Sequence, residues 1–252
     1  MLRGLINSQI WLSRNFDRLL QKKYNIDVNQ DYIKSFVPKY LRKDLVICEI
    51  GSGKTPYFDH KKKTLLNAII IGLDINIDEL NQAPKGIYDK IICADITKYQ
   101  GNNDTDIVIC QALLEHVKET EKAFSSISSI LKPGGLAIIF VPSRNSVYAR
   151  LNIILPQSIK KKLLHTIYQK TKLNQGFPAY YDKCTPLDFR KLAARNNFSI
   201  IDERFYYISS YFSFFFPAYL VWRLWVLLFV SLRKEQAAET FSMVLRKDNI
   251  QT

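Results

Sequence analysis

The fold is decided by one stretch of the chain, Val46-Ile47-Cys48-Glu49-Ile50-Gly51-Ser52-Gly53, in which a mostly apolar run ends in a Gly-x-Gly turn. Short continuous runs of this kind are typical of parallel strands that are covered on both faces. Glycines at the end of such a strand let the backbone approach a ligand closely. The stretch therefore predicts a strand that ends at a ligand-binding loop.

Two familiar glycine-rich loops do not fit this stretch. A phosphate-binding loop of the GxxxxGK[ST] type, which would use Gly53-Lys54-Thr55, needs a glycine where Cys48 stands. A dinucleotide-binding GxGxxG loop needs a glycine where Pro56 stands. The loop alone is also compatible with a plain strand-to-helix turn, so the neighbouring strands must decide.

Acids close the next two predicted strands. Asp74 follows an apolar run and lies 21 residues after Gly53, a placement suited to hydrogen bonding with ribose hydroxyls. Asp95 ends the following run, where it is placed to accept a hydrogen bond from an adenine amino group. Each acid taken alone also reads as a solvated turn residue. Their order after the glycine loop favours one shared nucleoside pocket.

Apolar runs alternate with polar, helix-like segments along the chain, as expected of an α/β protein with a doubly wound sheet. The runs predicted as strands are 45–50, 68–73, 91–94, 107–110, 136–141, 198–201 and 240–245. Helices are expected over the first 20 residues, over 31–41, over 115–131 and from Pro186 to about Asn196. The fold class is therefore α/β, with a Rossmann-like seven-stranded sheet, N-terminal helices and a hydrophobic helical insertion before the last strand.

The fourth predicted strand leads into Leu114-Glu115-His116-Val117, and the helix after it ends in Leu131-Lys132-Pro133-Gly134-Gly135. With the acid-x-Gly-x-Gly loop and the two strand-end acids, these motifs resemble the class I S-adenosylmethionine-dependent methyltransferases. The resemblance implies S-adenosyl-L-methionine as cofactor, and no metal is expected. With the predicted elements, it divides the chain into an N-terminal helical segment (1–44), a cofactor-binding core (45–143) and an acceptor-side region (144–252) that holds the last two strands and the apolar insertion.

The resemblance assigns cofactor contacts to the matched positions of this sequence. The residues implied for the methionine part are Glu49, Gly51, Ser52 and Gly53, with Gln111 or Ala112; those implied for the ribose and adenine are Asp74, Ile75, Asp95 and Ile96. The third glycine of many family members is replaced here by Lys54-Thr55-Pro56, which changes the exit of the loop.

The implied reaction is an in-line displacement at a sulfonium methyl group, which depends mainly on proximity and orientation. A general base is needed only for a poorly acidic hydroxyl acceptor, and His116 is the nearest candidate for that catalytic role. The alternative for His116 is a residue that packs or caps at a helix start. Tyr180, Tyr181 and Asp182 fall where this family often covers its substrate, although each also reads as a lid or packing residue.

The 252-residue chain has a net charge of +13, of which +10 falls after residue 143. There, residues 159–168 form a basic helical pattern, and residues 206–232 are rich in aromatic side chains with Arg223 as their only charge. Basic and aromatic segments of this kind suit an anionic membrane surface, whereas a solvated or buried helix explains them equally well. We expect a cytoplasmic protein, peripheral on the inner face of a membrane.

The expected partner is a small-molecule, lipid-linked or glycan-like methyl acceptor. Two alternatives are an RNA methyltransferase, in which the basic charge contacts phosphates, and a non-catalytic binding protein of the same fold. The four cysteines show no CxxC spacing, so a structural zinc site is not expected. Cys48, Cys93 and Cys110 lie in apolar runs and are expected to be buried free thiols.

Overall fold

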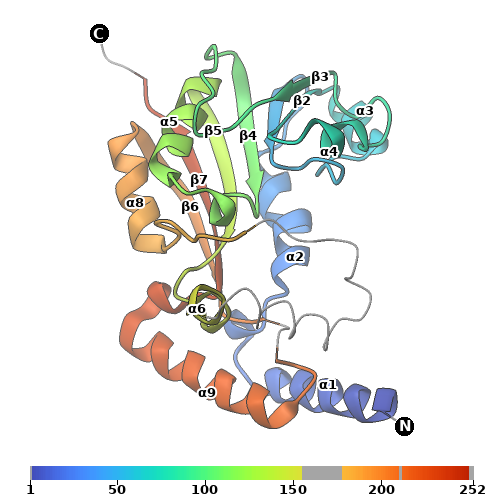
Figure 1. The fold of residues 1–252 in the computed structure, drawn as a ribbon, viewed down its shortest axis with the longest axis vertical. Coiled ribbons are helices and arrows are strands. Elements are labelled where there is room, and N and C mark those ends of the chain that lie inside the picture. Colours follow the sequence, from blue (N-terminus) through green and yellow to red (C-terminus); the bar gives the residue numbers. More distant parts are fainter. Residues whose placement is uncertain (1, 155–177, 210–211, 250–252) are drawn as a thin grey trace.

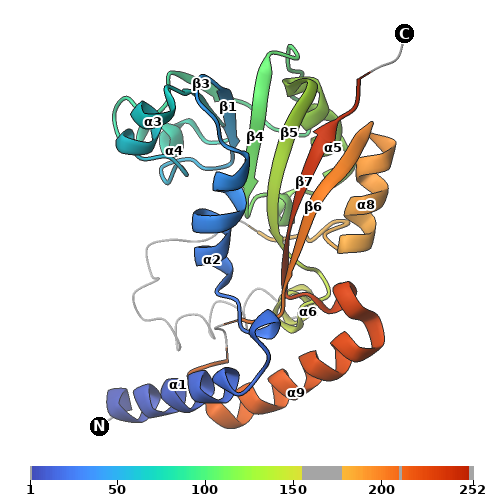
Figure 2. The ribbon, with the colours of Figure 1, turned by 180° about the vertical axis from the view of Figure 1, so that it is seen from behind.

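The computed structural model describes residues 2–154, 178–209 and 212–249. Its centre is a seven-stranded sheet with the order β3-β2-β1-β4-β5-β7-β6 (Figures 1 and 2). The strands are β1 (Val46–Ile50), β2 (Ile69–Asp74), β3 (Lys90–Cys93), β4 (Thr105–Gln111), β5 (Leu131–Pro142), β6 (Phe198–Tyr206) and β7 (Thr240–Lys247). Strands β1 to β5 are parallel, and β7 runs antiparallel to both of its neighbours. The predicted Rossmann-like fold is confirmed.

The helical elements either precede the first strand or connect successive strands. Before β1 lie α1 (Leu2–Arg18), the short turns η1 (Lys22–Tyr24) and α2 (Val28–Asp31), the π-helical η2 (Tyr32–Phe36) and η3 (Val37–Tyr40). Between strands lie α3 (His60–Leu66), α4 (Ile77–Asn81), η4 (Leu114–His116), α5 (Thr120–Ile130), α6 (Val147–Ile154), α8 (Pro186–Arg195), α9 (Phe216–Arg233) and η6 (Lys234–Ala237).

The sheet is buried on both faces because successive residues of each central strand enter different cores. In β1, Cys48 and Ile50 join the cluster that α5 and α8 cover, whereas Ile47 joins the cluster formed with η2 and its neighbours. All three side chains are at most 2% exposed. This alternation explains why the strands read as continuous apolar runs rather than as an alternating pattern.

The strand register brings the ends of the central strands to one edge. Ile50 of β1 pairs with Leu73 of β2 on one side and with Cys110 of β4 on the other. The residues that follow these three positions, Gly51, Asp74 and Gln111, therefore emerge at the same edge. That edge is where parallel α/β sheets bind their ligands.

Three local expectations are wrong. Residues 31–41 form π and 3₁₀ turns rather than one α-helix, and Pro38, which has no N–H to donate, lies within η3. Residues 115–131 are divided, because Val117 is extended between η4 and α5. Cys93 at the end of β3 is exposed, whereas Cys48 and Cys110 are buried free thiols as expected.

The predicted start of α8 is confirmed, whereas the Lys-Pro-Gly-Gly turn lies inside β5, near its start, and not before it. The Thr185 hydroxyl accepts a hydrogen bond from the Asp188 amide at 3.1 Å, with Pro186 in the first turn of α8. Thr105 pairs with Leu131 and Ile107 with Leu136, so the Lys-Pro-Gly-Gly segment loops out of the ladder. The basic pattern predicted over 159–168 lies outside the described residues.

Helices α1 and α9 form a layer at one end of the molecule. In both views they are the elements at the lower end of the long axis, beyond α6, and the arrowhead of β4 points toward them (Figures 1 and 2). The carboxyl ends of the parallel strands, and with them the predicted binding loop, therefore face the end of the molecule that this layer closes.

Candidate functional site

The loop after β1 has a backbone that only glycine accommodates without strain. Gly51 has a φ of +76°, its N–H donates to the Leu73 carbonyl at 2.8 Å, and a Cβ at this position would lie 2.8 Å from Leu113 Cδ1. Gly53 has a φ of +47°, and a Cβ there would lie 3.0 Å from Glu79 Cβ. The loop is thus packed closely between the start of η4 and α4.

Glu49, the acid before the loop, is fully buried. Its Oε2 accepts a hydrogen bond from the Tyr57 N–H at 2.8 Å, while Oε1 has no hydrogen-bond partner among the described residues. Burial raises the pKa of the Glu49 carboxyl, against the lowering effect of the Tyr57 hydrogen bond. A buried acceptor left without a partner is a position where a bound ligand is expected to supply the donor.

Asp74 closes β2 beside the same loop. Its Oδ1 accepts from the Asn76 N–H at 2.9 Å, and its Oδ2 lies 3.4 Å from where a Cβ on Gly53 would stand. Burial is the main cause of its raised pKa, and the nearby Glu79 carboxylate adds to it. The adjoining Ile75 side chain is 61% exposed, which leaves an apolar surface next to the carboxylate.

The two residues predicted from the third strand have different environments. Asp95 Oδ1 accepts from both the amide and the hydroxyl of Thr97, at 2.9 and 2.8 Å. Burial raises the pKa of Asp95, but these two hydrogen bonds and Lys98 outweigh it and leave the pKa lowered. Ile96 is only 5% exposed and belongs to the main core. Asp95 is thus an ionised turn acid, while Ile96 packs inward.

The end of β4 supplies the opposite wall of the site. Gln111 is partly buried, and Ala112 is exposed with a φ of +51°. The Ala112 N–H donates to the Phe140 carbonyl of β5 at 2.9 Å, which holds the strained backbone in place. Both residues emerge at the edge that carries the glycine loop and Asp74.

His116 ends η4, and its side chain is tied to the segment that enters α8. Its Nδ1 lies 3.0 Å from the Pro178 carbonyl oxygen. Because a carbonyl oxygen only accepts hydrogen bonds, this contact places a proton on Nδ1. In the neutral ring Nε2 is then the nitrogen that can accept a proton, and it lies 3.8 Å from Glu115 Oε1.

Glu115 is the second buried acid of the site. Its side chain is about as enclosed as that of Glu49, and Oε2 has no hydrogen-bond partner among the described residues. Burial raises the pKa of Glu115 to about 8. Its backbone carbonyl accepts the N–H groups of Tyr180 and Tyr181, at 2.7 and 2.9 Å. Glu115 therefore anchors the 178–184 segment and is largely neutral at pH 7.

The three residues predicted on the substrate side have three environments. Tyr180 is 40% exposed, with the Lys118 ammonium 5.0 Å from its ring centre. Tyr181 is 3% exposed. Asp182 Oδ2 accepts from the Thr120 N–H at 3.0 Å, and its carbonyl accepts the Thr120 hydroxyl at 2.6 Å. Tyr180 thus lies on the protein surface, Tyr181 is buried in the core, and Asp182 caps the start of α5.

Several residues that shape the site carry no recognisable signal in the sequence. Leu113 packs on Gly51, Glu79 packs on Gly53, and the Tyr88 hydroxyl donates to the Gly53 carbonyl at 3.0 Å. Lys54 forms an ion pair with Glu79 at 2.9 Å. Leu113 comes from the β4–β5 connection, and Glu79 and Tyr88 come from the β2–β3 connection, so only the folded chain brings them to the loop.

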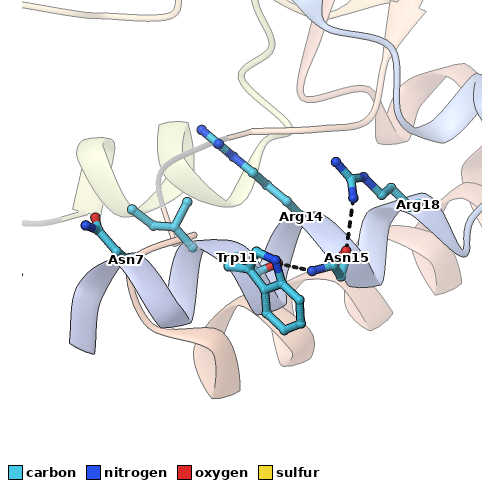
Figure 3. A pocket seen from close by; sticks show the side chains of 6 residues that line it. Asn7, Trp11, Arg14, Asn15 and Arg18 are labelled. Carbon is cyan, nitrogen blue, oxygen red and sulfur yellow. Dashed lines mark hydrogen bonds between the residues drawn. The ribbon is translucent and has the colours of Figure 1, made fainter. Parts of the chain in front are cut away.

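Two hollows lie away from this site, in the α1–α9 layer. One, of about 370 Å³, is lined by α1 residues that include Arg14 and Arg18, which project from the same side of the helix (Figure 3). The other, of about 580 Å³, lies between α6 and the start of α9. Among the residues that the structure describes, no group of three or more His, Cys, Asp or Glu side chains is arranged to hold a metal ion.

Comparison with known proteins matches residues 48–139 to the methyltransferase domain family. A ubiquinone biosynthesis O-methyltransferase of Colwellia psychrerythraea is 30% identical over 120 residues, which cover 44% of this chain and 47% of that protein. A malonyl-[acyl-carrier protein] O-methyltransferase of Ilyobacter polytropus is 31% identical over 113 residues, 42% of each protein. The chain thus matches less than half the length of these curated relatives.

Solved structures share the fold at low sequence identity. A methyltransferase of Methanosarcina mazei, described as S-adenosylmethionine-dependent, superposes with a TM-score of 0.54 at 16% identity, over 85% of this chain and 97% of that one. A phosphoethanolamine N-methyltransferase of Haemonchus contortus, solved with S-adenosyl-L-methionine, gives 0.54 at 14% identity, over 87% of this chain and 53% of that one.

Proposed function

Because residues 48–139 form a methyltransferase domain with the class I, S-adenosylmethionine-dependent fold, we propose that the protein transfers a methyl group from S-adenosyl-L-methionine to a small-molecule, lipid-linked or glycan-like acceptor. We place this reaction on the cytoplasmic side of a membrane surface, in keeping with the basic C-terminal half of the chain.

The observation that carries the proposal is the environment of the glycine loop. Gly51 and Gly53 hold a backbone that a Cβ would obstruct, and Glu49 beside them keeps a buried oxygen without a partner. An ammonium group matches such an acceptor, because a charge-assisted hydrogen bond offsets the cost of burying the carboxylate. The residues present therefore fit the methionine part of the cofactor.

The remaining groups fit a ribose and an adenine. Asp74 offers Oδ2 beside the loop while Oδ1 is held by Asn76, so the carboxylate is oriented before a ligand arrives. The exposed Ile75 side chain offers an apolar face for a planar base. Asp95 is held by Thr97 and stays ionised, which suits it to accept a hydrogen bond from an exocyclic amino group.

When bound, S-adenosyl-L-methionine supplies an electrophilic methyl group on a sulfonium. The work left to the protein is to hold the acceptor atom in line and to exclude water, which together account for most of the rate gain in such a displacement. We assign Gln111 and Ala112 to the methionine side of the site and the exposed Tyr180 to the acceptor side. For a hydroxyl acceptor, His116 Nε2 is the base that this arrangement provides.

The experiment is a transfer assay with cofactor labelled on its methyl group. The protein is incubated separately with lipid, water-soluble and RNA fractions of the cells that make it, and incorporation is compared with Asp74→Ala. We expect label in the lipid or water-soluble fraction, strongly reduced in the variant. Absence of label from every fraction, or label confined to RNA, would contradict the proposal.

A further inference from the structure

The α1–α9 layer, defined as residues 4–24 and 212–234, encloses a buried ion pair and exposes many apolar side chains. Arg223, in the middle of α9, is fully buried and forms an ion pair with Asp17 of α1 at 2.7 Å. Its guanidinium also donates to the carbonyls of Tyr24 and Tyr207, at 2.7 and 2.5 Å, and Tyr219 bonds the other oxygen of Asp17. These contacts fix α1 against α9.

The outward face of α9 is apolar along its whole length. Its exposed side chains are Val221 (69%), Leu224 (54%), Trp225 (51%), Leu228 (54%) and Leu232 (70%), which recur at helical spacing. The inward face is also apolar, since Tyr219, Trp222 and Val226 are buried. Only 22% of the residues in the most apolar part of this helix are buried, so most of α9 is not enclosed by the protein.

Helix α1 adds a second apolar row. Leu5 and Leu12 lie seven residues apart, on one side of the helix, and are 63% and 37% exposed; Leu19, directly after α1, is 83% exposed. Between α6 and α9 the hollow of about 580 Å³ is walled by apolar side chains, among them Phe215, Val221 and Trp225. A space of this size and lining suits hydrocarbon rather than water.

The same layer also exposes positive charge. The exposed charges of the layer are Arg14, Arg18, Lys22 and Lys23 near α1, with Arg233 and Lys234 at the end of α9. Its only carboxylate in sequence is Asp17, which is already paired with Arg223. The exposed charge of the layer is therefore entirely positive. A layer whose exposed side chains are largely apolar and whose exposed charges are all positive is complementary to an anionic lipid bilayer.

Helix α9 is long and apolar enough to cross a bilayer, but its connections oppose crossing. The chain leaves the sheet at Tyr206 and returns at Thr240, and these two residues are paired neighbours. In between, Phe216 N–H bonds Gln9 of α1 and Arg223 bonds Asp17. The helix is thus attached to the protein at its start and middle and lies across the end of the molecule (Figure 1).

We propose that the α1–α9 layer is a docking surface for an anionic membrane, with α9 lying in the plane of the interface. The carboxyl ends of the parallel strands point to the same end of the molecule as this layer (Figure 2). Docking therefore turns the proposed methyl-transfer site toward the bilayer, and the acceptor class it favours is a lipid-embedded molecule. This last consequence rests on the proposed function, whereas docking itself does not.

The test is flotation of the purified protein with vesicles of phosphatidylcholine alone or mixed with phosphatidylglycerol. We expect the protein to float with the mixed vesicles, with binding that weakens as salt rises. The double variant Leu224→Ser/Leu228→Ser should lose about tenfold or more in bound fraction, because two apolar side chains no longer leave water. Leu65→Ser, an equally exposed leucine (67%) on α3, is the matched control and should bind normally.

The same vesicles test two further features: the contribution of the positive charge on α1, and the depth to which the layer enters the bilayer. Arg14→Gln/Arg18→Gln should weaken binding to the mixed vesicles about tenfold, and Lys61→Gln/Lys85→Gln, two exposed lysines beside α3 and β3, should not. All three tryptophans of the chain belong to the layer. Brominated acyl chains should therefore quench the fluorescence of the wild-type protein, and Trp11→Phe/Trp225→Phe should remove most of that quenching.

Vesicle binding needs no methyl transfer, so its failure is distinguishable from failure of the proposed function. Thermal unfolding of each variant in the absence of lipid serves as the folding control. No flotation on the mixed vesicles, or equal flotation of Leu224→Ser/Leu228→Ser, would overturn the proposal. So would a concentration-dependent dimer that the same variant abolishes in a protein that does not bind vesicles, because the apolar face would then be an interface between copies.

Discussion

At the carboxyl ends of β1 and β2, acids such as Glu49 and Asp74 stand beside a glycine loop, each with an oxygen available to a ligand. In the α1–α9 layer, Asp17 and Arg223 form a buried ion pair with each other, and leucine and tryptophan side chains face outward. The first region is organised to receive a polar molecule. The second is organised to meet an apolar phase, so two regions of one small protein differ in the surroundings that suit them.

The largest effect, a loss of stability in the α1–α9 layer, is expected from Arg223→Ala. Removing the arginine leaves Asp17 buried without its cation, a change that typically costs about 3–5 kcal/mol. The matched control is Arg190→Ala, because the Arg190–Glu203 ion pair is partly exposed, and such pairs are worth about 0–1 kcal/mol. The free energy of unfolding in urea measures both. Equal losses would show that burial of the Asp17–Arg223 pair does not organise the layer.

The next prediction concerns the proposed cofactor site at the carboxyl ends of β1 and β2. Asp74→Ala removes the carboxylate expected to hold the ribose, and the affinity for S-adenosyl-L-methionine should fall about 10- to 100-fold, as for loss of hydrogen bonds to a charged group. Asp78→Ala, an exposed acid on the neighbouring α4, controls for net charge and should bind as the wild type does. Titration calorimetry measures both constants. A similar affinity for the two variants would remove Asp74 from the cofactor site.

A smaller effect separates backbone strain from crowding in the loop. Gly51→Ala and Gly134→Ala both place a side chain at a φ near +80°, at a cost of about 1–2 kcal/mol each. Only Gly51 also meets a neighbour, since a Cβ on Gly134 has nothing within 4 Å. Gly51→Ala should therefore lose about 1–3 kcal/mol more in stability and should also weaken cofactor binding. Identical behaviour in thermal unfolding and titration would contradict the close packing against Leu113.

A further effect is a pH dependence that Glu115 contributes. Its pKa is about 8 in the folded protein and 4.5 ordinarily, so the folded state holds about one more proton between these values. This contribution to stability is fully present below pH 4.5 and is lost as the pH rises through 8. Melting temperatures between pH 5 and 8.5 should therefore fall less steeply for Glu115→Gln than for the wild type. Parallel curves would mean that Glu115 titrates normally.

The sequence was sufficient to predict the strands and their ends, because apolar runs and the acids that follow them are local features. The order of Glu49, Asp74 and Asp95 along the chain placed all three at one edge of a parallel sheet without knowledge of any contact. The predicted boundaries differ from the observed ones by a few residues, mainly where β5 and β6 extend beyond their apolar runs.

What the sequence did not disclose depends on contacts between distant residues. Asp182 caps α5 from 62 residues away, and Arg223 finds Asp17 across 206 residues. Arg223 in an aromatic segment reads as an exposed charge until its partner is known. The side of α9 that faces outward is likewise fixed only when α1 has packed on the other side.

The glycine loop is proposed to bind the cofactor and the α1–α9 layer to bind the membrane. The most direct test of both roles is hydrogen–deuterium exchange of the wild-type protein with each ligand in turn. S-adenosyl-L-methionine should slow exchange around residues 50–57 and 74–77 and leave α9 unchanged. Mixed phosphatidylcholine–phosphatidylglycerol vesicles should slow exchange in α1 and α9 and leave the glycine loop unchanged. The account is contradicted if the cofactor protects no part of the loop, or if the vesicles leave α1 and α9 as they are in solution.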